Sequence, residues 1–285
     1  MSIVPQVLRS LKNLPPFPAV AQRALLLLNA PEVNIQELVE VVKFDPAVTA
    51  NILRISNSAY FASNQEIHSL HQALMLLGTQ ELLKIIVFSG ATRLFMSATP
   101  GYFTERRGLW QHSVSCALMM DLLTRKLHLS DQATGFTAGL LHDIGKIVLS
   151  SFGEQKFIEI MELVEQQGVS LLEAEKIVFG INHAEIGGEM ARMWNFPDRL
   201  RLAIAYHHLD KPEAHIDDLI LLVYLADLLA LMEEQDRGPE ALDFTGDPEV
   251  LSHFNLEPRD LEEILSQFGS ARDEAQVFFG LMESR

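Results

Sequence analysis

The feature of this sequence that most constrains its fold is a histidine and an aspartate placed inside an apolar segment. His142 and Asp143 interrupt the run from Gly139 to Leu149, whose other members are glycine or aliphatic apart from Lys146. Burying an imidazole beside a carboxylate costs several kcal/mol unless each side chain finds a partner. A divalent cation would serve both, because the carboxylate can bridge two metals while the histidine donates a ring nitrogen. A solvent-facing pair at a helix end explains this segment alone equally well.

Apolar residues elsewhere follow helical spacing, and no segment shows convincing strand alternation. Asn34 and Glu37 have the spacing of a capping box, and Asp45-Pro46 supplies a cap and a first-turn proline. Gly78 is expected to end one helix before the next begins. These patterns predict an all-α fold. In the second half we expect helices over 109–127, 132–151, 154–167, 170–180, 183–194, 198–208 and 216–233, followed by one or two amphipathic helices from Pro258.

Composition along the chain predicts three parts. Residues 1–105 form an N-terminal helical lobe of short capped helices, packed on a second lobe over 106–235 that carries the polar cluster. The connection from Met96 to Arg107 contains proline and glycine. Residues 236–285 form a C-terminal loop and helices, and Gln235–Pro248 is expected to be a surface loop because it is rich in glycine, proline and aspartate.

Charge and hydropathy exclude several classes of protein. The formal net charge is −16 and no basic stripe is present, so we expect no nucleic-acid partner. The longest apolar run, Leu219–Met232, carries Asp227 and is shorter than the roughly 20 residues that a membrane span needs. We therefore expect a core helix and no membrane. The N-terminus lacks a secretion signal and the chain has one cysteine, which indicates a cytoplasmic protein.

Other histidines and one aspartate lie beside apolar helical stretches and extend the candidate site. His112 begins a helix, His183 lies beside a cap, His207-His208 end a helix, and Asp227 interrupts the longest apolar run. Each has a simpler explanation by itself, such as a core histidine or a favourable helix dipole. Together with His142 and Asp143 they favour a shared divalent-metal site. The remaining histidines have polar or loop contexts and are left out: His68, His71, His128, His215 and His253.

Cys116 follows His112 by four residues and so lies on the same helical face. A thiolate ligand is conceivable there. A small buried core cysteine is the more common case, and it is the interpretation that we prefer from the sequence.

The order His112, His142-Asp143, Asp227 resembles the HD-domain superfamily of metal-dependent phosphohydrolases, and His183 with His207-His208 resembles the added ligands of its two-metal branch. From about residue 10 to residue 235 the chain is more similar to the HDOD family. The matching segments are Leu14–Pro18, Asp45–Thr49, Asn57–Phe61, Trp110–Ser113 and Gly139–Lys146. The resemblance implies an all-α bacterial protein of signalling or regulation with no established reaction. Many HDOD members have lost metal ligands that this chain retains.

Two departures limit what the resemblance implies. Cyclic-di-GMP hydrolases of the superfamily carry a Gly-Tyr-Pro motif after the paired histidines, where this chain has Leu209–Glu213. Members with three metals place a glutamate one turn before the first histidine, where this chain has Gly108. We therefore expect neither cyclic-di-GMP hydrolysis nor a third metal.

Two functions follow. The preferred hypothesis is a signalling or regulatory protein with an HD-like divalent-metal site, whose partner is a regulatory protein or a small phosphorylated ligand. The alternative is a metal-dependent phosphohydrolase acting on a phosphomonoester or a cyclic nucleotide phosphodiester. One or two cations, Fe, Mn, Zn or Ni, would be bridged by Asp143, and Lys146 would stabilise phosphate charge. The resemblance assigns one metal to His112, His142 and Asp227, and the other to His183, His207 and His208.

Overall fold

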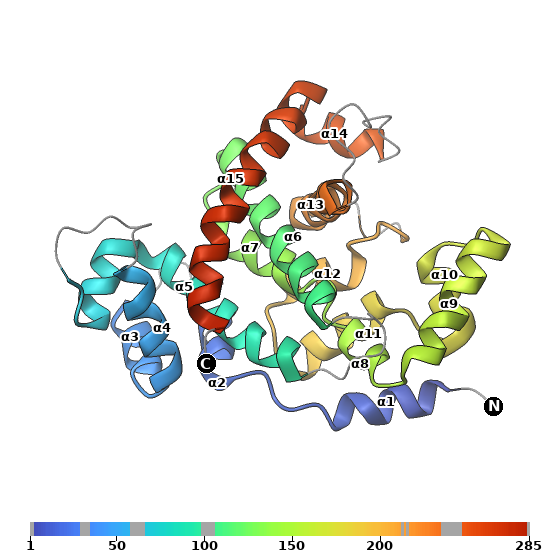
Figure 1. The fold of residues 1–285 in the computed structure, drawn as a ribbon, viewed down its shortest axis with the longest axis horizontal. Helices are drawn as coiled ribbons and strands as arrows, with labels where there is room; N and C mark the ends of the chain where they lie inside the picture. The colour runs from blue at the N-terminus through green and yellow to red at the C-terminus, as the bar shows by residue number, and fades with distance from the viewer. Residues whose placement is uncertain are drawn as a thin grey trace.

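The computed structural model of the chain describes residues 3–28, 35–57, 66–97, 106–211, 214, 217–234 and 247–283, and within these ranges it contains helices and no strand (Figure 1). The all-α fold is confirmed. One hydrophobic cluster extends from Val7 in the first helix to Phe268 in the last, so the described parts of the chain share a continuous core. The predicted boundaries at residues 105 and 235 adjoin segments outside the described residues.

The described residues of the N-terminal half form five helices: α1 Val4–Lys12, α2 Ala19–Leu28, α3 Ile35–Val42, α4 Pro46–Ser56 and α5 Leu70–Ser97. The predicted start of α4 is confirmed, because Asp45 accepts hydrogen bonds from the Ala47 and Val48 amides at 3.1 Å. The predicted break at Gly78 is confirmed too, since its φ of 76° interrupts α5. Asn34, the expected cap of α3, lies outside the described residues.

The helices of the second half are α6 Arg106–Lys126, α7 Gln132–Leu141, α8 Lys146–Ser150, α9 Glu154–Gln167, α10 Leu171–Phe179, α11 His183–Met193, α12 Asp198–Tyr206 and α13 Asp218–Glu234. They agree with the predicted ranges except at one place. The single helix expected over 132–151 is wrong, because residues 142–145 form a turn between α7 and α8.

The turn at residues 142–145 has a local cause and a packing cause. Backbone bonds here run from residue i+3 to residue i, as from the Lys146 amide to the Asp143 carbonyl at 2.9 Å, which winds the chain tighter than an α-helix. Gly145 also lies directly against α11, where a Cβ atom would stand 1.9 Å from the His183 carbonyl oxygen. The turn therefore directs Asp143 toward His183 on α11 and His142 toward Asp227 on α13.

The C-terminal helices are α14 Pro248–Phe254, which the sequence analysis did not predict, and α15 Pro258–Glu283. α15 buries Leu261, Ile264, Leu265 and Phe268, which confirms the amphipathic face expected there. Residues 235–246 of the predicted surface loop lie outside the described residues.

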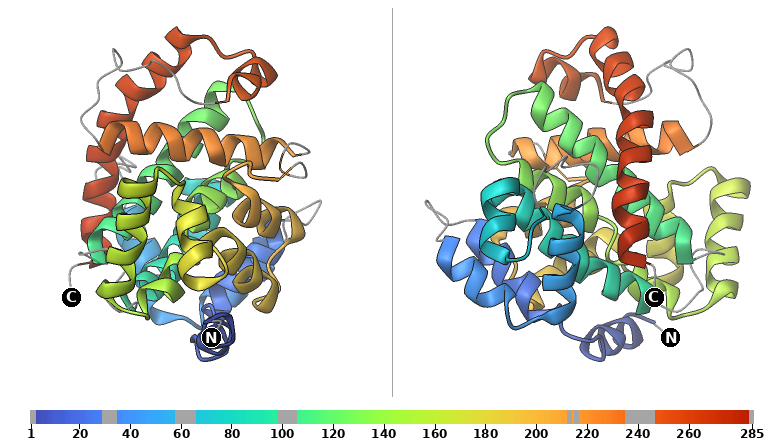
Figure 2. Two further views of the ribbon diagram at one scale, coloured as in Figure 1. Left: turned by 90° about the vertical axis from the view of Figure 1, so that its right-hand side faces the viewer. Right: turned by 60° about the vertical axis from the view of Figure 1, so that its left-hand side comes forward.

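The helices are arranged around α6 and α7, which pack against each other (Figures 1 and 2). α13 and α15 cover α6, while α11 and α12 form a pair that joins α7 and α13 through α12. α2, α3 and α4 pack on α5, which in turn contacts α6 and α7. The pair α9 and α10 lies at the opposite end of the molecule from α3 and α4 (Figure 1).

Two apolar helices could be mistaken for membrane spans. α13 contains the run Leu219–Met232, and its buried residues confirm the predicted core helix. α5 is long and apolar enough over Leu70–Met96 to cross a membrane by length and composition. However, 67% of its apolar window is buried within the fold and the helix kinks at Gly78, so α5 is a second core helix.

Substituting Gly145 tests the close approach between the 142–145 turn and α11. We expect Gly145→Ala to lower the free energy of unfolding by about 1–3 kcal/mol, because the new methyl group must push two backbones apart. Gly269→Ala is the matched control. Gly269 is within α15 and has nothing within 4 Å of its Cβ position, so the same change should stabilise by about 0.5–1 kcal/mol. Urea unfolding of the two variants measures both values, and equal effects would contradict the packing described.

Candidate metal centre

The structure brings all seven predicted ligands together from separate helices. His112 comes from α6, His142 and Asp143 from the turn after α7, His183 from the first position of α11, His207 and His208 from the end of α12, and Asp227 from α13. All are buried except His208, which is partly exposed. The ligand atoms form two adjacent clusters, each within a span of 4.8 Å.

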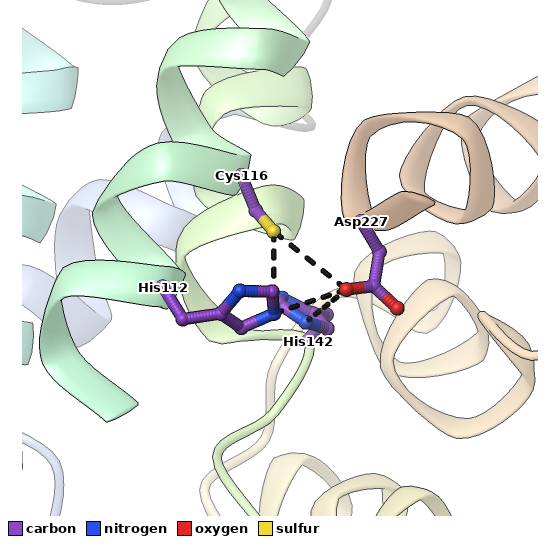
Figure 3. Close-up of side chains that lie close together, drawn as sticks. All are labelled: His112, Cys116, His142 and Asp227. Atoms are coloured by element: carbon purple, nitrogen blue, oxygen red, sulfur yellow. Dashed lines mark hydrogen bonds and ion pairs between the residues drawn. The ribbon is translucent and has the colours of Figure 1, made fainter. Parts of the chain in front are cut away.

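The first cluster joins α6, the 142–145 turn and α13 (Figure 3). His112 Nε2 lies 3.0 Å from Asp227 Oδ1, and His142 Nε2 lies 3.7 Å from the same oxygen. Cys116 is the fourth member, with its Sγ 3.6 Å from His112 Nε2 and 4.0 Å from Asp227 Oδ1. The sequence analysis preferred a packing role for this cysteine, and the structure places it among polar ligand atoms.

The second cluster joins the 142–145 turn, α11 and the end of α12. Asp143 Oδ1 lies 3.2 Å from His183 Nε2 and 3.8 Å from His207 Nε2. His183 Nε2 and His208 Nε2 are 2.8 Å apart. Two imidazole lone pairs at that distance repel unless a proton or a cation lies between them.

Asp143 lies between the two clusters and offers one oxygen to each. Its Oδ2 is 3.4 Å from His142 Nε2 and 3.7 Å from His112 Nε2, while its Oδ1 faces His183 and His207. Burial alone would raise the pKa of this carboxyl, but the charge of Lys146 holds it well below its usual value. Asp143 is therefore an ionised carboxylate whose two oxygens face the two clusters.

Hydrogen bonds to the far side of two imidazoles determine which ring nitrogen faces the centre. His142 donates its Nδ1–H to the Gly139 carbonyl at 2.7 Å, and His207 donates to the Ile204 carbonyl at 2.8 Å. A carbonyl oxygen can only accept, so Nδ1 carries the hydrogen and Nε2 is left with a lone pair. This arrangement is typical of metal-binding histidines.

Glu175, on α10, orients His183 and was missed by the sequence analysis. The carboxylate is fully buried and accepts from the His183 amide at 2.7 Å and from His183 Nδ1 at 2.8 Å. A signal existed, because Glu175 lies one helical turn from both Leu171 and Phe179, on the apolar face of α10. A buried glutamate on such a face requires a partner as much as His142 and Asp143 do.

Three buried atoms at the middle of the site have no hydrogen-bond partner among the residues that the structure describes. They are His142 Nε2, Asp143 Oδ1 and His207 Nε2. Buried polar groups are nearly always paired, and each unpaired one costs about 1–3 kcal/mol. All three are electron-pair donors that point to the same region, so hydrogen bonds among themselves cannot satisfy them. Their chemistry fits divalent metals that accept nitrogen and oxygen ligands.

Among the histidines of the second cluster, the surroundings favour a proton on His183 and disfavour one on His207 and His208. Burial and the neighbouring His208 lower the pKa of His207 well below its usual value, and burial and His183 lower that of His208 to about 3. Burial opposes a charge on His183, but the Glu175 charge and the hydrogen bonds to Asp143 and Glu175 together raise its pKa. In the first cluster, burial raises the pKa of the Cys116 thiol to about 12, so a thiolate would form there only beside a cation.

Lys146 was expected to meet a phosphate oxygen. In the structure it begins α8, is buried, and places its Nζ 2.5 Å from Asp143 Oδ2. Burial opposes its charge, but Asp143 and Asp227 raise its pKa. Lys146 is therefore a positively charged partner of the bridging carboxylate, and its contact with phosphate stays a prediction.

The histidines that the sequence analysis left out are absent from both clusters, as far as the described residues show. His253 pairs with Asp218 at 2.7 Å, and His68 lies 3.8 Å from Glu66. His215 lies outside the described residues.

Two curated relatives are similar to the chain over part of their length. An uncharacterised protein of Treponema pallidum (strain Nichols) is 25% identical over 199 residues, and a Ribonuclease Y of Desulfotalea psychrophila is 28% identical over 158 residues. These alignments cover 69% and 55% of this chain, but only 38% and 23% of the relatives. The chain thus spans well under half of each relative.

Two solved structures have the same fold over nearly their whole length. An HDOD domain protein of unknown function from Geobacter sulfurreducens has a TM-score of 0.76 at 24% identity, covering 96% of this chain and 97% of that one. A phosphohydrolase candidate from Shewanella amazonensis SB2B has a TM-score of 0.69 at 21% identity, covering 93% and 94%. At these identities the likeness shows the fold.

The family is shown by a direct match to the sequence. The family model of the HDOD domain matches residues 14–209, which is most of the chain and includes every ligand of both clusters except Asp227. The resemblance noted in the sequence is thereby confirmed, and the chain belongs to the HDOD family.

Proposed function

We propose that this HDOD protein binds two divalent cations at the candidate metal centre and hydrolyses a phosphoester there. The observation that carries the proposal is the convergence of His142 Nε2, Asp143 Oδ1 and His207 Nε2, buried and without partners among the described residues. A cation in the first cluster would relieve His142 Nε2, and one in the second would relieve Asp143 Oδ1 and His207 Nε2. A centre that holds two cations side by side can supply the chemistry of phosphoester hydrolysis, which is why we propose an enzyme.

The chain's own residues have distinct roles in this proposal. His112, His142 and Asp227 would hold one cation, His183, His207 and His208 the other, and Asp143 would hold both. A bound pair of cations lowers the pKa of a shared water and neutralises charge on a substrate phosphate. Glu175 holds His183 in the orientation that presents Nε2. Lys146, already cationic beside Asp143, would add positive charge near the phosphate oxygens.

The substrate class follows from this chemistry and not from a visible substrate site. A phosphomonoester or a cyclic nucleotide phosphodiester suits a two-cation centre, with Fe, Mn, Zn or Ni as the metals. The names of two similar proteins, a ribonuclease and a phosphohydrolase candidate, belong to the same class of reaction. The net charge of −16 disfavours a long polyanionic substrate, so a small phosphoester is the better candidate.

A regulatory role is the second candidate, and one feature favours it. Among the described residues, the N-terminal helices α1–α5 contribute nothing to either cluster. This half of the chain does expose large apolar side chains, with Phe44, between α3 and α4, 77% accessible and Met75, on α5, 76% accessible. A regulatory protein that binds this half would leave the cations a structural role.

Replacing the bridging carboxylate separates the two candidates. We expect the wild-type protein to retain divalent metal and to hydrolyse an aryl phosphodiester or a nucleotide in a metal-dependent way. Asp143→Asn should weaken the binding of both cations, because each would lose a ligand. Turnover should therefore fall by more than the roughly 10- to 100-fold that is typical when a residue that only orients a metal ligand is replaced. Metal content by mass spectrometry and product release measure the two effects.

The matched control is Asp198→Asn, the same chemical change at a side chain that is 88% exposed, and it should leave both values unchanged. Bound metal without turnover on monoesters, cyclic nucleotides, dinucleotides and RNA would favour the regulatory candidate. Wild-type protein that binds no divalent metal would end the proposal.

Glu175 can be tested as a positioning residue of the second cluster. Glu175→Gln keeps the size of the side chain but removes the charge that fixes His183 Nδ1–H, so we expect affinity for one of the two cations to fall about 10- to 100-fold. Competition with a chelating dye measures each affinity. Glu162→Gln, on the exposed face of α9, is the control. An equal fall in both affinities would indicate a general loss of folding and contradict the assigned role.

A further inference from the structure

We infer that Cys116 is a ligand of the cation held by His112, His142 and Asp227, so that this cation is a thiophilic metal such as Zn²⁺, Fe²⁺ or Co²⁺. The inference rests on the proposed function in one respect, namely that the centre binds a metal. It concerns which metal occupies the first cluster and what distinguishes it from the second.

The distances in the first cluster are those of a four-coordinate site. Zinc bonds of about 2.0–2.2 Å to nitrogen and oxygen and about 2.3 Å to sulfur place the ligand atoms of a tetrahedron about 3.3–3.6 Å apart. Cys116 Sγ is 3.6 Å from His112 Nε2 and 4.0 Å from Asp227 Oδ1. The two histidine nitrogens are 3.0 Å and 3.7 Å from Asp227 Oδ1. The distance from the sulfur to His112 therefore matches a tetrahedral edge, and the distance from the sulfur to Asp227 is slightly longer than one.

The surroundings of the sulfur are unusual for a packing cysteine. A core thiol normally lies among aliphatic groups, whereas this fully buried sulfur faces an imidazole nitrogen and a carboxylate oxygen (Figure 3). A neutral thiol is a weak hydrogen-bond donor, and 4.0 Å is long even for sulfur. A coordinated thiolate accounts for both neighbours.

An independent feature points to a ligand in the same place. His142 Nε2 is completely buried, has no partner among the described residues, and belongs to the same cluster. The Nδ1–H of His142 is donated to the Gly139 carbonyl, so Nε2 can only act as an electron-pair donor toward the cluster. Cys116 would thus complete a site that His142 already requires.

The backbone holds Cys116 and His142 in register. Cys116 follows His112 by one helical turn on α6, so both side chains leave the same face. On α7, a Cβ atom at Gly139 would lie 2.7 Å from the Cys116 carbonyl oxygen, which shows that the two helices meet at this residue. Gly139 is the same residue whose carbonyl orients the His142 ring. The contact between α6 and α7 at Gly139 therefore positions both Cys116 and His142.

A thiolate would make the two clusters chemically different. Soft sulfur ligands favour zinc, iron and cobalt, while magnesium and manganese prefer oxygen-rich sites. The second cluster offers three imidazoles and Asp143 without sulfur. The two clusters would therefore differ in metal selectivity, and the first cluster would bind Mn²⁺ more weakly than the second.

Cobalt substitution tests the inference directly, because Cys116 is the sole cysteine of the chain. We expect the full-length protein titrated with Co²⁺ to develop visible ligand-field bands together with a near-ultraviolet thiolate-to-cobalt charge-transfer band. Cys116→Ala should lose the charge-transfer band while retaining ligand-field bands from the second cluster. The ratio of Zn²⁺ affinity to Mn²⁺ affinity should also be smaller in Cys116→Ala than in the wild-type protein. The wild-type spectrum is decisive even if the variant folds poorly.

The other outcomes are distinguishable. Cobalt that binds with ligand-field bands but no charge-transfer band in the wild-type protein would overturn the role of Cys116 and leave the proposed metal centre standing. Absence of any cobalt spectrum, together with absence of zinc binding, would overturn both. A charge-transfer band that persists in Cys116→Ala would show that sulfur from methionine or buffer is responsible, and the inference would fail.

Discussion

The arrangement of this protein depends on one buried carboxylate, Asp143, which is 1% exposed and is surrounded by imidazoles. One of its oxygens faces His112 and His142, and the other faces His183 and His207. Lys146 balances the carboxylate charge, but His142 Nε2 and His207 Nε2 have no hydrogen-bond partner among the described residues. Uncompensated lone pairs are costly in a low-dielectric interior, and cations that share these electron pairs would remove that cost.

Glycines allow the helices that carry the ligands to pack closely around the site. At Gly187 an added Cβ would lie 2.8 Å from Ile204, and at Gly188 it would lie 2.7 Å from Ala205, so α11 and α12 are in close contact there. That contact brings His183 to the histidines at the end of α12. Gly139 on α7 likewise packs against α6, and Gly145 in the 142–145 turn packs against α11. The ligands converge because glycines let four helices approach more closely than side chains would permit.

The two candidate functions share this centre and differ in whether a substrate or a protein partner binds to the molecule. α5 packs against α2, α3 and α4 on one side and against α6 and α7 on the other. It therefore connects the N-terminal half to the helix that precedes His142. His208 is the one ligand that is not buried, which makes the end of α12 the more accessible side of the centre. A substrate would approach from there, whereas a protein partner would act through α5.

What the sequence determined by itself was local: the helices, because their apolar periodicity and caps are properties of neighbouring residues, and the identity of the seven candidate ligands. The capped start of α4 and the break at Gly78 are of this kind. Only the tertiary structure decided that the ligands meet, that residues 142–145 form a turn, and that Glu175 and Cys116 adjoin the site. Periodicity shows that a helix face is apolar but not which side chains of another helix lie opposite it. Cys116 therefore resembled a packing residue until α7 and α13 were placed beside it.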